Sequence, residues 1–441
     1  MLAGRLAYPW VYTPGSVESM LQWFESQEGD RLKIAVVGSG VSGLAVAHLL
    51  GRRHEVTVFE ADTRLGGHIH TVSTPQGHAV DTGFIVFNEP NYPHFCRLLD
   101  SLEVESQPTS MSFSVRDDRD GTEYSGGSLG ALFAQRANLL RPGHWRMLAG
   151  VKRFMKSGAL LAQEPPELTV EQFLERDQYG REFGERFLAP LAAALWSCPS
   201  DRVHQFPIRF VAGFLLNHHM LQLHGKPVWR VVKGGSNVYL KALVARTKAE
   251  FKLAAPVERI ERTADSIQIN FGSRSEYFDE AIVAVHADQA LKIHQDPTLE
   301  ECALLSAFRY QANDVVLHTD TSLLPKSQKA WASWNYRIPS AFSDSATVTY
   351  DMNLLQGLES DLTYCVSLNE MANIAPEKVI GRYVYHHPVA SRAGLDAQTK
   401  RSRLIRHRGI SYVGAYWGYG FHEDGMRSAV EVAAAFEEGP A

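Results

Sequence analysis

Runs of apolar residues divide the first part of the chain into alternating strands and helices. Residues 34–37 form a continuous apolar run bounded by turn residues, which predicts a buried parallel strand. Apolar residues then recur at helical spacing after Gly43, and a second strand is predicted at 55–60. Strand, turn, helix and strand in this order predict the beginning of a parallel α/β sheet.

The pattern of the remaining chain changes twice. Two short strands around a turn are predicted at 72–74 and 78–81, and a mainly helical stretch follows, in which Thr169 and Gln172 form a capping box. Alternating strands then predominate, so a second sheet is expected to have one packed face and one face that lines a cavity. Helices are predicted at 92–102, 128–163 with an interruption at Pro142-Gly143, 170–176, 180–198, 206–219 and from 239, and strands at 112–115, 123–124, 253–260, 266–271, 278–285, 315–319, 332–336, 346–353, 363–368 and from 410.

A glycine motif separates the first strand from its helix. Gly38 permits a tight turn, Gly40 lets the backbone approach a pyrophosphate, and Gly43 lets helix and strand pack closely. The helix N-terminus directs unpaired N–H groups and a positive dipole end at the phosphates. Glu60 lies about 20 residues beyond the first glycine, where a carboxylate meets the ribose hydroxyls. The motif in this context predicts dinucleotide binding.

A second glycine turn follows almost at once, in Arg64-Leu65-Gly66-Gly67-His68. It lets another piece of backbone approach the same diphosphate, which a nicotinamide dehydrogenase does not need. Here the sequence resembles the flavin amine oxidase and phytoene desaturase superfamily, whose signature is GxGxxG, an acid, and Arg-x-Gly-Gly-Arg-x-x-Thr. The resemblance implies FAD as the cofactor. His68 stands where the superfamily usually has arginine, so Arg64 becomes the cation expected near the phosphates.

The resemblance continues in later segments. An Asp-x-Gly of the superfamily runs beneath the flavin ring, and Asp81 and Gly83 match it. The backbone at the position of Val257 usually meets the adenine. A C-terminal motif places a helix N-terminus near the isoalloxazine, where the helix dipole favours negative charge on the reduced flavin. The residues of that motif are Gly414, Gly425 and Met426.

The implied fold class is α/β, with a Rossmann-type FAD-binding domain of the glutathione-reductase-like kind interleaved with an α+β substrate domain. A chain of 441 residues is long enough for two intertwined domains. An extension at 1–30, in which 17–24 favours a short helix, precedes them. The expected parts are FAD-binding residues 31–100, a mainly helical substrate domain at 101–224, FAD-binding residues 225–290, a substrate-domain sheet at 291–400 and FAD-binding residues 401–441.

Within the superfamily, the sequence most resembles a subgroup of predicted FAD oxidoreductases associated with cyclopropane and methylated fatty acyl synthesis. His68 in place of arginine is at home in this subgroup. The resemblance implies a substrate that is an acyl chain or a phospholipid. The residues that carry it are Gly66-Gly67-His68, Asp81-Thr82-Gly83-Phe84, Trp331-Ala332-Ser333-Trp334-Asn335-Tyr336, Tyr350-Asp351-Met352-Asn353 and Gly414-Ala415-Tyr416-Trp417.

Amine oxidases of the superfamily usually have a lysine near the flavin N5, on a strand of the substrate domain. The corresponding strand here begins Asn313-Asp314-Val315 and has no lysine. This absence argues against an amine oxidase. Aromatic residues that could hold an amine are nevertheless present at Tyr416, Trp417 and Tyr419.

Three functions remain open. The first is an FAD-dependent desaturase of membrane-lipid acyl chains, in which flavin N5 accepts a hydride from a C–H beside a double bond or branch. The second is a redox-neutral isomerase or mutase that uses reduced FAD, and the third is a flavin-binding accessory protein for a lipid methyltransferase. The residues considered as proton acceptor are His422, Glu423, His318 and Asp351, each of which is alternatively a structural polar residue.

Composition narrows the partners and the compartment. The formal net charge of −5 gives no reason to expect nucleic acid as a partner. The four cysteines are widely spaced and form no metal-binding pattern, which is typical of thiols in a reducing compartment. No apolar run of about 18 residues is present. A cytoplasmic protein is therefore expected.

Residues 128–163 combine helical spacing with basic charge. Apolar residues are interleaved with six basic residues, and no acidic residue is present. Such a segment is what an interfacial helix needs to meet anionic lipid headgroups. A peripheral membrane contact and a solvated face of the substrate domain are both consistent with it. The basic residues are Arg136, Arg141, Arg146, Lys152, Arg153 and Lys156.

Overall fold

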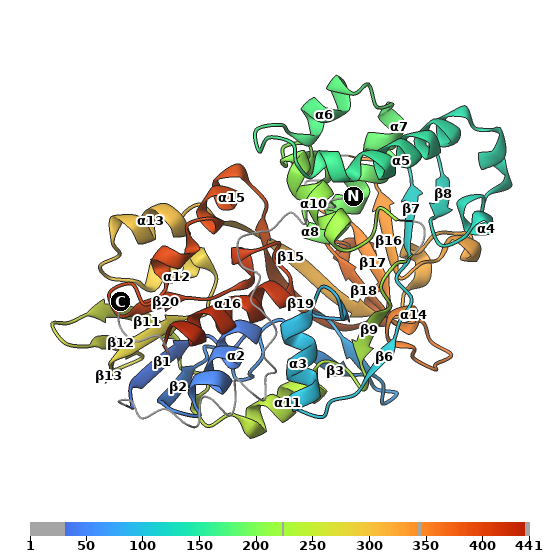
Figure 1. The fold of residues 1–441 in the computed structure, drawn as a ribbon. Helices are drawn as coiled ribbons and strands as arrows, with labels where there is room; N and C mark the ends of the chain where they lie inside the picture. Colours follow the sequence, from blue (N-terminus) through green and yellow to red (C-terminus); the bar gives the residue numbers. More distant parts are fainter. Residues whose placement is uncertain (1–30, 223–224, 342–344, 437–441) are drawn as a thin grey trace.

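A five-stranded parallel sheet joins three distant parts of the chain (Figure 1). The computed structural model describes residues 31–222, 225–341 and 345–436, so the expected extension at 1–30 and its helix at 17–24 lie outside the described residues. The strand order is β10-β2-β1-β14-β20, with every neighbouring pair parallel. The strands are β1 (Lys33–Val37), β2 (Glu55–Phe59), β10 (Glu250–Lys252), β14 (Glu280–Val283) and β20 (Ile410–Tyr412).

Each face of this sheet packs against a different layer, because successive residues of a strand point to opposite faces. One layer consists of α2 (Val41–Leu50), α3 (Pro93–Ser101), α11 (Asn237–Arg246) and α16 (His422–Ala435). The other consists of β11 (Val257–Arg262), β12 (Ile267–Phe271), β13 (Arg274–Phe278), α12 (Ala287–Ile293) and α13 (Leu299–Leu305). Ile34 and Val36 of β1 face the first layer, and Ala35 and Val37 face the second. This double burial explains the continuous apolar run.

A seven-stranded sheet forms the base of the second lobe. Its order is β19-β15-β18-β17-β16-β7-β8, and its neighbours are antiparallel except for β16 and β7. The strands are β7 (Phe113–Asp117), β8 (Thr122–Ser125), β15 (Arg309–His318), β16 (Trp334–Ile338), β17 (Val348–Asp351), β18 (Cys365–Leu368) and β19 (Val379–Val389). The long pair of β15 and β19 runs from Arg309 opposite Val389 to His318 opposite Val379.

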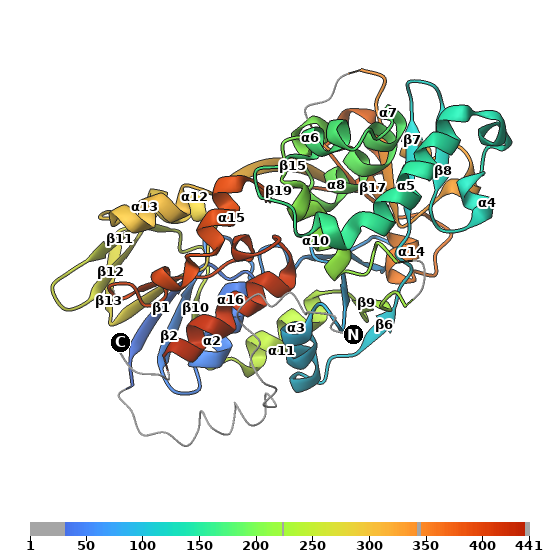
Figure 2. The ribbon, with the colours of Figure 1, turned by 45° about the horizontal axis from the view of Figure 1, so that its top comes forward.

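Helices cover one face of the seven-stranded sheet (Figures 1 and 2). They are α4 (Leu129–Leu132), α5 (Pro142–Leu161), α6 (Val170–Arg176), α7 (Arg181–Phe183), α8 (Ala189–Trp196), α9 (Ser200–Val203) and α10 (Ile208–Asn217). Pro142 starts α5, so the helix predicted at 128–163 is interrupted there as expected, but residues 128–141 contain only the short α4 and a 3₁₀ turn at Arg136–Leu140. The capping box of Thr169 and Gln172 is present. Among the described residues, no helix is long and apolar enough to cross a membrane.

Smaller elements complete the fold. The hairpin predicted at 72–74 and 78–81 is confirmed as β3 (Thr71–Ser73) and β4 (Ala79–Asp81). A three-stranded sheet contains β5 (Val86–Asn88), β9 (Trp229–Val232) and β6 (Ser106–Pro108). Two further helices are α14 (Met352–Gln356) and α15 (Arg392–Gln398). The division of the chain into six domain parts stays a prediction.

Two predictions of strands were incomplete, and one long strand was not predicted. The strand expected at 253–260 is interrupted, because Ala254 has a φ of +48° and its N–H donates to the carbonyl of Asp62, so the chain turns before β11. The strand expected at 278–285 belongs to two sheets, and it divides at Asp279, whose N–H donates to Lys33. Strand β19 was not predicted, although its valines and tyrosines favour a strand.

A buried ion pair attaches α13 to the lobe of the parallel sheet. Arg262 Nη2 on β11 lies 2.5 Å from Glu301 Oε1, and the two side chains are 6% and 0% exposed. The Tyr412 hydroxyl donates to the same oxygen at 2.8 Å, and the Thr298 N–H donates to Oε2 at 2.7 Å. These additional bonds explain how the carboxylate is accommodated without water.

We expect Arg262→Met to lower the free energy of unfolding by about 3–5 kcal/mol, because it leaves the carboxylate of Glu301 buried without its cation. The double variant Arg262→Met/Glu301→Leu should recover most of this loss, since no unpaired charge remains. Chemical denaturation measures both. Arg259→Met is a control on the same strand, because Arg259 is 49% exposed and its change should stay within about 1 kcal/mol. A single variant as stable as the wild type would contradict this account.

Candidate flavin site

Two glycine turns meet at the carboxyl end of β1. Gly38 and Gly66 have φ angles of +103° and +111°, which only glycine adopts readily. A β-carbon placed on Gly67 would lie 3.4 Å from the Cα of Gly40, so the second turn lies directly against the first. A β-carbon placed on Gly40 itself would meet no atom within 4 Å. Gly40 therefore faces open space, as the approach of a pyrophosphate requires.

The N-termini of two helices lie beside these turns. Helix α2 begins after its N-cap Gly40, and a β-carbon on Gly43 would be 2.0 Å from the carbonyl oxygen of Gly38. Helix α16 lies alongside, since a β-carbon on Gly425 would be 2.7 Å from the Ser42 hydroxyl. Both helices bring unpaired N–H groups and a positive dipole end to the same region. The arrangement fits a diphosphate group.

Glu60 fixes the geometry between the two turns. Its Oε2 accepts hydrogen bonds from the Ser39 N–H at 3.0 Å and from the Ser39 hydroxyl, and its Oε1 accepts from the Asp62 N–H at 2.8 Å. The Ser39 hydroxyl in turn accepts from the Gly66 N–H at 3.2 Å. The predicted ribose contact of Glu60 stays a prediction, but its carboxylate lies where both turns meet.

Arg64 supplies a cation at the second turn. Its guanidinium donates to the carbonyl of Gly67 at 2.8 Å and to that of Ile69 at 3.4 Å. Its Nε also lies 3.6 Å from the Asp62 carboxylate, and the side chain remains 35% exposed. A contact of Arg64 with the phosphates stays a prediction, for which the observed position is suitable.

His68 lies among other imidazole and phenol rings. Its ring centroid is 4.8 Å from that of Tyr385 and 5.5 Å from that of His387. Burial, together with the nearby imidazoles of His387 and His286, holds the pKa of His68 well below its usual value. Its Nε2 atom is buried without a hydrogen-bond partner among the described residues. Such an atom is costly unless something binds it, and a cofactor atom at the Gly-Gly turn would do so.

Asp81 connects three segments of the chain. Its Oδ1 accepts from the Thr71 hydroxyl at 2.5 Å and from the Ser236 N–H and hydroxyl at 2.9 and 2.7 Å. Its Oδ2 accepts from the Gln356 amide at 3.0 Å. Burial raises the pKa of Asp81 to about 6, although these hydrogen bonds oppose the shift. A β-carbon on Gly83 would be 2.1 Å from the carbonyl oxygen of His68, so this segment lies against the second turn.

The other predicted cofactor contacts lie around the same turns. Val257 starts β11, two residues after Ala255, whose N–H donates to the Glu60 carbonyl at 2.8 Å. The Gly414 N–H donates to the Ser428 hydroxyl of α16 at 2.9 Å. The Met426 side chain packs in the core beside α2, which leaves only its backbone to face a cofactor. Their roles toward the cofactor stay predictions.

Two of the suggested proton acceptors, His422 and Glu423, are the first two residues of α16. The His422 ring stacks on Phe84 at 3.7 Å, and its Nε2 lies 2.6 Å from the Tyr239 hydroxyl. Burial lowers the pKa of His422 to about 3. Glu423 accepts from the N–H groups of His94 and Phe95 at 2.8 and 3.0 Å, so it caps α3, while burial raises its pKa to about 8.

The other two acceptors are bonded within the seven-stranded sheet. His318 Nε2 lies 2.8 Å from the Ser367 hydroxyl, and its Nδ1 accepts from the Asp320 N–H at 3.0 Å. Asp351 is the N-cap of α14 and accepts from the Leu354 N–H at 3.1 Å. Both side chains therefore have structural partners, and their catalytic roles stay predictions.

The comparisons with known proteins agree with this geometry. Residues 41–357 match the family described as flavin containing amine oxidoreductase. The chain belongs to this family. An L-amino-acid oxidase from Siganus canaliculatus is 22% identical over 66% of this chain and 57% of its own length. A zeta-carotene desaturase from Solanum lycopersicum is 29% identical over 24% of this chain and 18% of its own length. The chain therefore spans little more than half the length of the first of these relatives, and much less of the second.

A crystal structure of a fatty acid isomerase from P. acnes that produces CLA has the same fold. It covers 93% of this chain and 100% of its own, with a TM-score of 0.69 and 15% identity. Membership of the flavin-containing family, the two glycine turns and the two helix N-termini identify FAD as the cofactor of this flavin amine oxidoreductase. The α/β fold with a Rossmann-type FAD-binding domain is likewise confirmed.

Several residues of the site were missed by the sequence analysis. Tyr385 and His387 of β19 contact the second turn, but without that strand they could not be placed. The Tyr385 hydroxyl lies 2.9 Å from His70 Nδ1 and 2.8 Å from the Thr82 hydroxyl. Gln356 was also missed as a partner of Asp81, because it is 275 residues away in the sequence. Only the Val and Tyr pattern of β19 was a usable signal.

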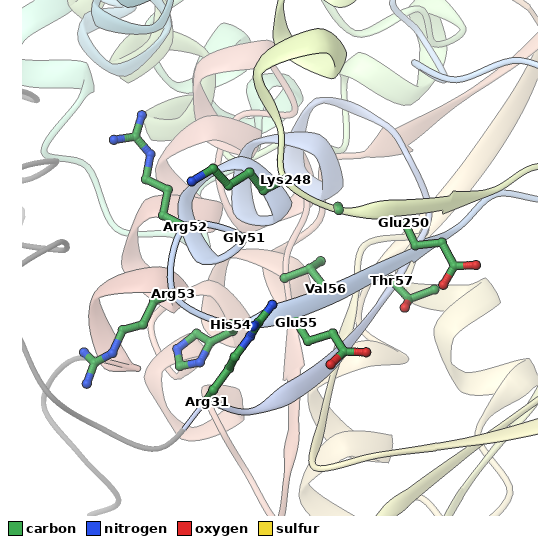
Figure 3. A pocket seen from close by; sticks show the side chains of 11 residues that line it. Arg31, Gly51, Arg52, Arg53, His54, Glu55, Val56, Thr57, Lys248 and Glu250 are labelled. Carbon is green, nitrogen blue, oxygen red and sulfur yellow. The ribbon is translucent and has the colours of Figure 1, made fainter.

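A further hollow lies at the opposite end of the parallel sheet (Figure 3). Its wall comes from the turn between α2 and β2, with Arg52 and Arg53, and from Lys248 and Glu250 beside β10. These residues lie at the amino ends of the strands, whereas ligands of parallel α/β sheets bind beyond the carboxyl ends. The hollow is therefore separate from the flavin site.

We expect Gly40→Ala to fold normally but to lose most of its FAD, because the new methyl group occupies only the open space that the pyrophosphate needs. Gly43→Ala should instead destabilise the protein, since its β-carbon meets the Gly38 carbonyl at 2.0 Å. Flavin absorption per protein and thermal unfolding separate the two effects. Gly126→Ala is a matched control, whose nearest atom is 4.0 Å away. Full FAD content in Gly40→Ala would contradict the assignment of the cradle.

The buried histidines should make stability depend on pH. Burial lowers the folded-state pKa of His318 to about 4, whereas the ordinary value is 6.5. The unfolded chain therefore binds more protons between these values, and stability is lost as the pH falls from 6.5 towards 4. His318→Gln should reduce the slope of unfolding free energy against pH by about 1.4 kcal/mol per unit in this window. Ser367→Ala should lower the unfolding free energy at every pH without changing its slope against pH. An unchanged slope in His318→Gln would contradict the burial of a neutral imidazole.

Proposed function

We propose that the protein is an FAD-dependent oxidoreductase that desaturates a long-chain acyl chain, methyl-branched or already unsaturated, of a membrane phospholipid. The supporting observation is a narrow cleft between the helical layer and the loop that leads into α16. No charged side chain lines this cleft in the part of the chain that the structure describes. Its lining includes Trp196, Phe210, Phe308, Leu395, Tyr416 and Tyr419.

The walls of the cleft suit an apolar substrate. The Phe210 and Tyr419 rings lie 5.2 Å apart, and the Trp196 indole N–H donates to the Tyr419 carbonyl at 3.1 Å, so helices α8 and α10 are held against the loop. A hydrocarbon chain gains free energy when it leaves water for such a surface. An ammonium group would find no carboxylate there. The free volume of the cleft is about 20 Å³, so it holds a small part of an apolar substrate at most, and its walls favour an apolar group over an ammonium.

The position of the amine-oxidase lysine supports the same choice. Asn313 is buried, and its amide nitrogen lies 3.1 Å from His387 Nδ1, while its oxygen accepts from the Asn369 amide at 2.8 Å. Asp314 is exposed. Neither residue provides the lysine side chain that the resemblance would require near the flavin of an amine oxidase.

Desaturation requires that one carbon lose a hydride and its neighbour a proton as the double bond forms. Bound FAD supplies the hydride acceptor. We propose His422 as the proton acceptor, because it alone among the four candidates packs on the segment 81–84. A proton can reach Nδ1 if Nε2 donates to the Tyr239 hydroxyl. Burial lowers the pKa of His422 to about 3, so the ring is neutral and able to accept the proton, which it releases to solvent before the next turnover.

A redox-neutral isomerase is the second candidate, because a solved structure of the same fold is a fatty acid isomerase. It would need FAD reduced beforehand and would consume no electron acceptor. An accessory role beside a lipid methyltransferase would instead give a protein that holds FAD and lipid but has no turnover alone. The cytoplasm suits each of these, since the four cysteines are free.

The test is anaerobic mixing of the FAD-loaded protein with vesicles of phospholipids that carry methyl-branched or unsaturated acyl chains. We expect the band of oxidised flavin to disappear and the acyl chain to lose two hydrogens, as mass spectrometry would show. Flavin reduction by amines but not by lipid would exclude the proposal. Product that forms only after chemical reduction of the flavin, with unchanged acyl mass, would favour the isomerase.

Leu395→Lys tests the cleft itself. A charge beside the acyl chain should lower the turnover of lipid by about tenfold or more, because burying it against hydrocarbon is costly, while FAD content stays normal. Leu362→Lys is the matched control, since Leu362 is 41% exposed and lies outside the cleft. Equal turnover in both variants would place the substrate elsewhere.

A further inference from the structure

Large apolar side chains are exposed together on one part of the helical layer. Five of the fourteen exposed large apolar residues in the described chain lie between 129 and 160. Leu140 is 87% exposed, and it lies beside the exposed Leu139 and near Trp145 rather than alone. The five, which we call the apolar group, are Leu129, Leu139, Leu140, Trp145 and Leu160.

The structure separates these residues from the apolar residues of the same segment that form the core. Met147, Phe154 and Leu161 of α5 are buried. The core side of α5 contacts the chain after α10, where a β-carbon on Gly158 would be 2.2 Å from Leu221. Trp145 and Leu160 therefore lie on the side of α5 that faces away from the core.

Cations lie on this outer face of α5. Trp145, Lys152 and Lys156 are spaced by seven and four residues, which places them on one side of a helix, and all three are exposed. Lys152 and Lys156 have no ion pair within the described ranges, whereas Arg146 pairs with Glu182 and Arg153 stacks on the Tyr179 ring. The free cations thus have exposed apolar neighbours on the same face.

The N-terminal end of this face is held rigidly. The Trp145 indole N–H donates to the Leu139 carbonyl at 3.0 Å, and its ring lies 5.3 Å from that of Phe133. Leu139 and Leu140 are thereby fixed beside the indole before α5 begins. Figures 1 and 2 show α4 and α5 at the opposite end of the molecule from β12 and β13.

We propose that this face binds the surface of an anionic lipid bilayer, with the apolar group inserted between headgroups and Lys152 and Lys156 bound to phosphate. A tryptophan, exposed leucines and unpaired lysines on one helix face are the combination that an interfacial helix uses. The inference extends the proposed function, but its evidence is independent of the acyl chemistry.

The test is sedimentation of the full-length, FAD-loaded protein with vesicles of phosphatidylcholine, with or without phosphatidylglycerol. We expect binding to the anionic vesicles, weakened by salt, and little binding to pure phosphatidylcholine. Lys152→Gln and Lys156→Gln should each weaken binding about fivefold. Leu140→Ser should weaken it as well, without loss of FAD or thermal stability, because the side chain is exposed.

Lys241→Gln and Leu299→Ser are matched controls, because both residues are exposed and lie on α11 and α13 in the other lobe. Neither should change vesicle binding. The proposal would be overturned if the wild type did not bind anionic vesicles. It would also be overturned if Lys152→Gln, Lys156→Gln and Leu140→Ser bound them as well as the wild type. A dimer in solution that Leu140→Ser dissociates would also overturn it, since a second copy would then cover the face. Vesicle binding without acyl turnover would reject only the proposed reaction.

Discussion

The contact between the backbones of the two glycine turns is the constraint on which the structure depends. Any side chain at Gly43 would collide with the Gly38 carbonyl, and Gly67 already lies against Gly40. The first turn fixes α2 on β1, and the second brings the segment after Glu60 back across the carboxyl end of the sheet. Because α16 packs beside α2 through Gly425, the last helix is positioned by the same contact. Three distant parts of the chain thus define one cradle.

Asp81 connects the second glycine turn to the second lobe by hydrogen bonds. Its carboxylate binds Thr71 after the second turn, Ser236 at the start of α11, and Gln356 at the end of α14. A buried carboxylate with a raised pKa is costly unless several donors surround it, so the three segments must meet closely. The segment 81–84 then leads to Phe84 and its stacked His422. Asp81 thus joins the segment after the second glycine turn to α11 and α14 by hydrogen bonds, and Phe84 adds a stacked contact with α16.

The sequence was sufficient to predict those features that depend only on residues close together in the chain. The glycine motifs, the capping box at Thr169 and the interruption of the helical pattern at Pro142 each depend on neighbouring residues, and all were predicted. It was insufficient where the structure depends on contacts between residues far apart in the chain. Glu423 was considered as a proton acceptor because no local pattern shows that it caps α3, more than 300 residues earlier. Strand β19 was missed because the segments that it contacts, β15 and the second glycine turn, come from distant parts of the chain.

The helical layer gains a simple explanation if both proposals hold. Helix α10 carries Phe210 into the cleft on one side and packs against α5 on the other. Helices α5 and α10 both lie between the proposed bilayer surface and the cleft, and packed helices lie about 8–10 Å apart. Within the described ranges the cleft has no charged lining, and two unpaired lysines lie on the outer face of α5; under both proposals these features contact the two ends of one lipid molecule.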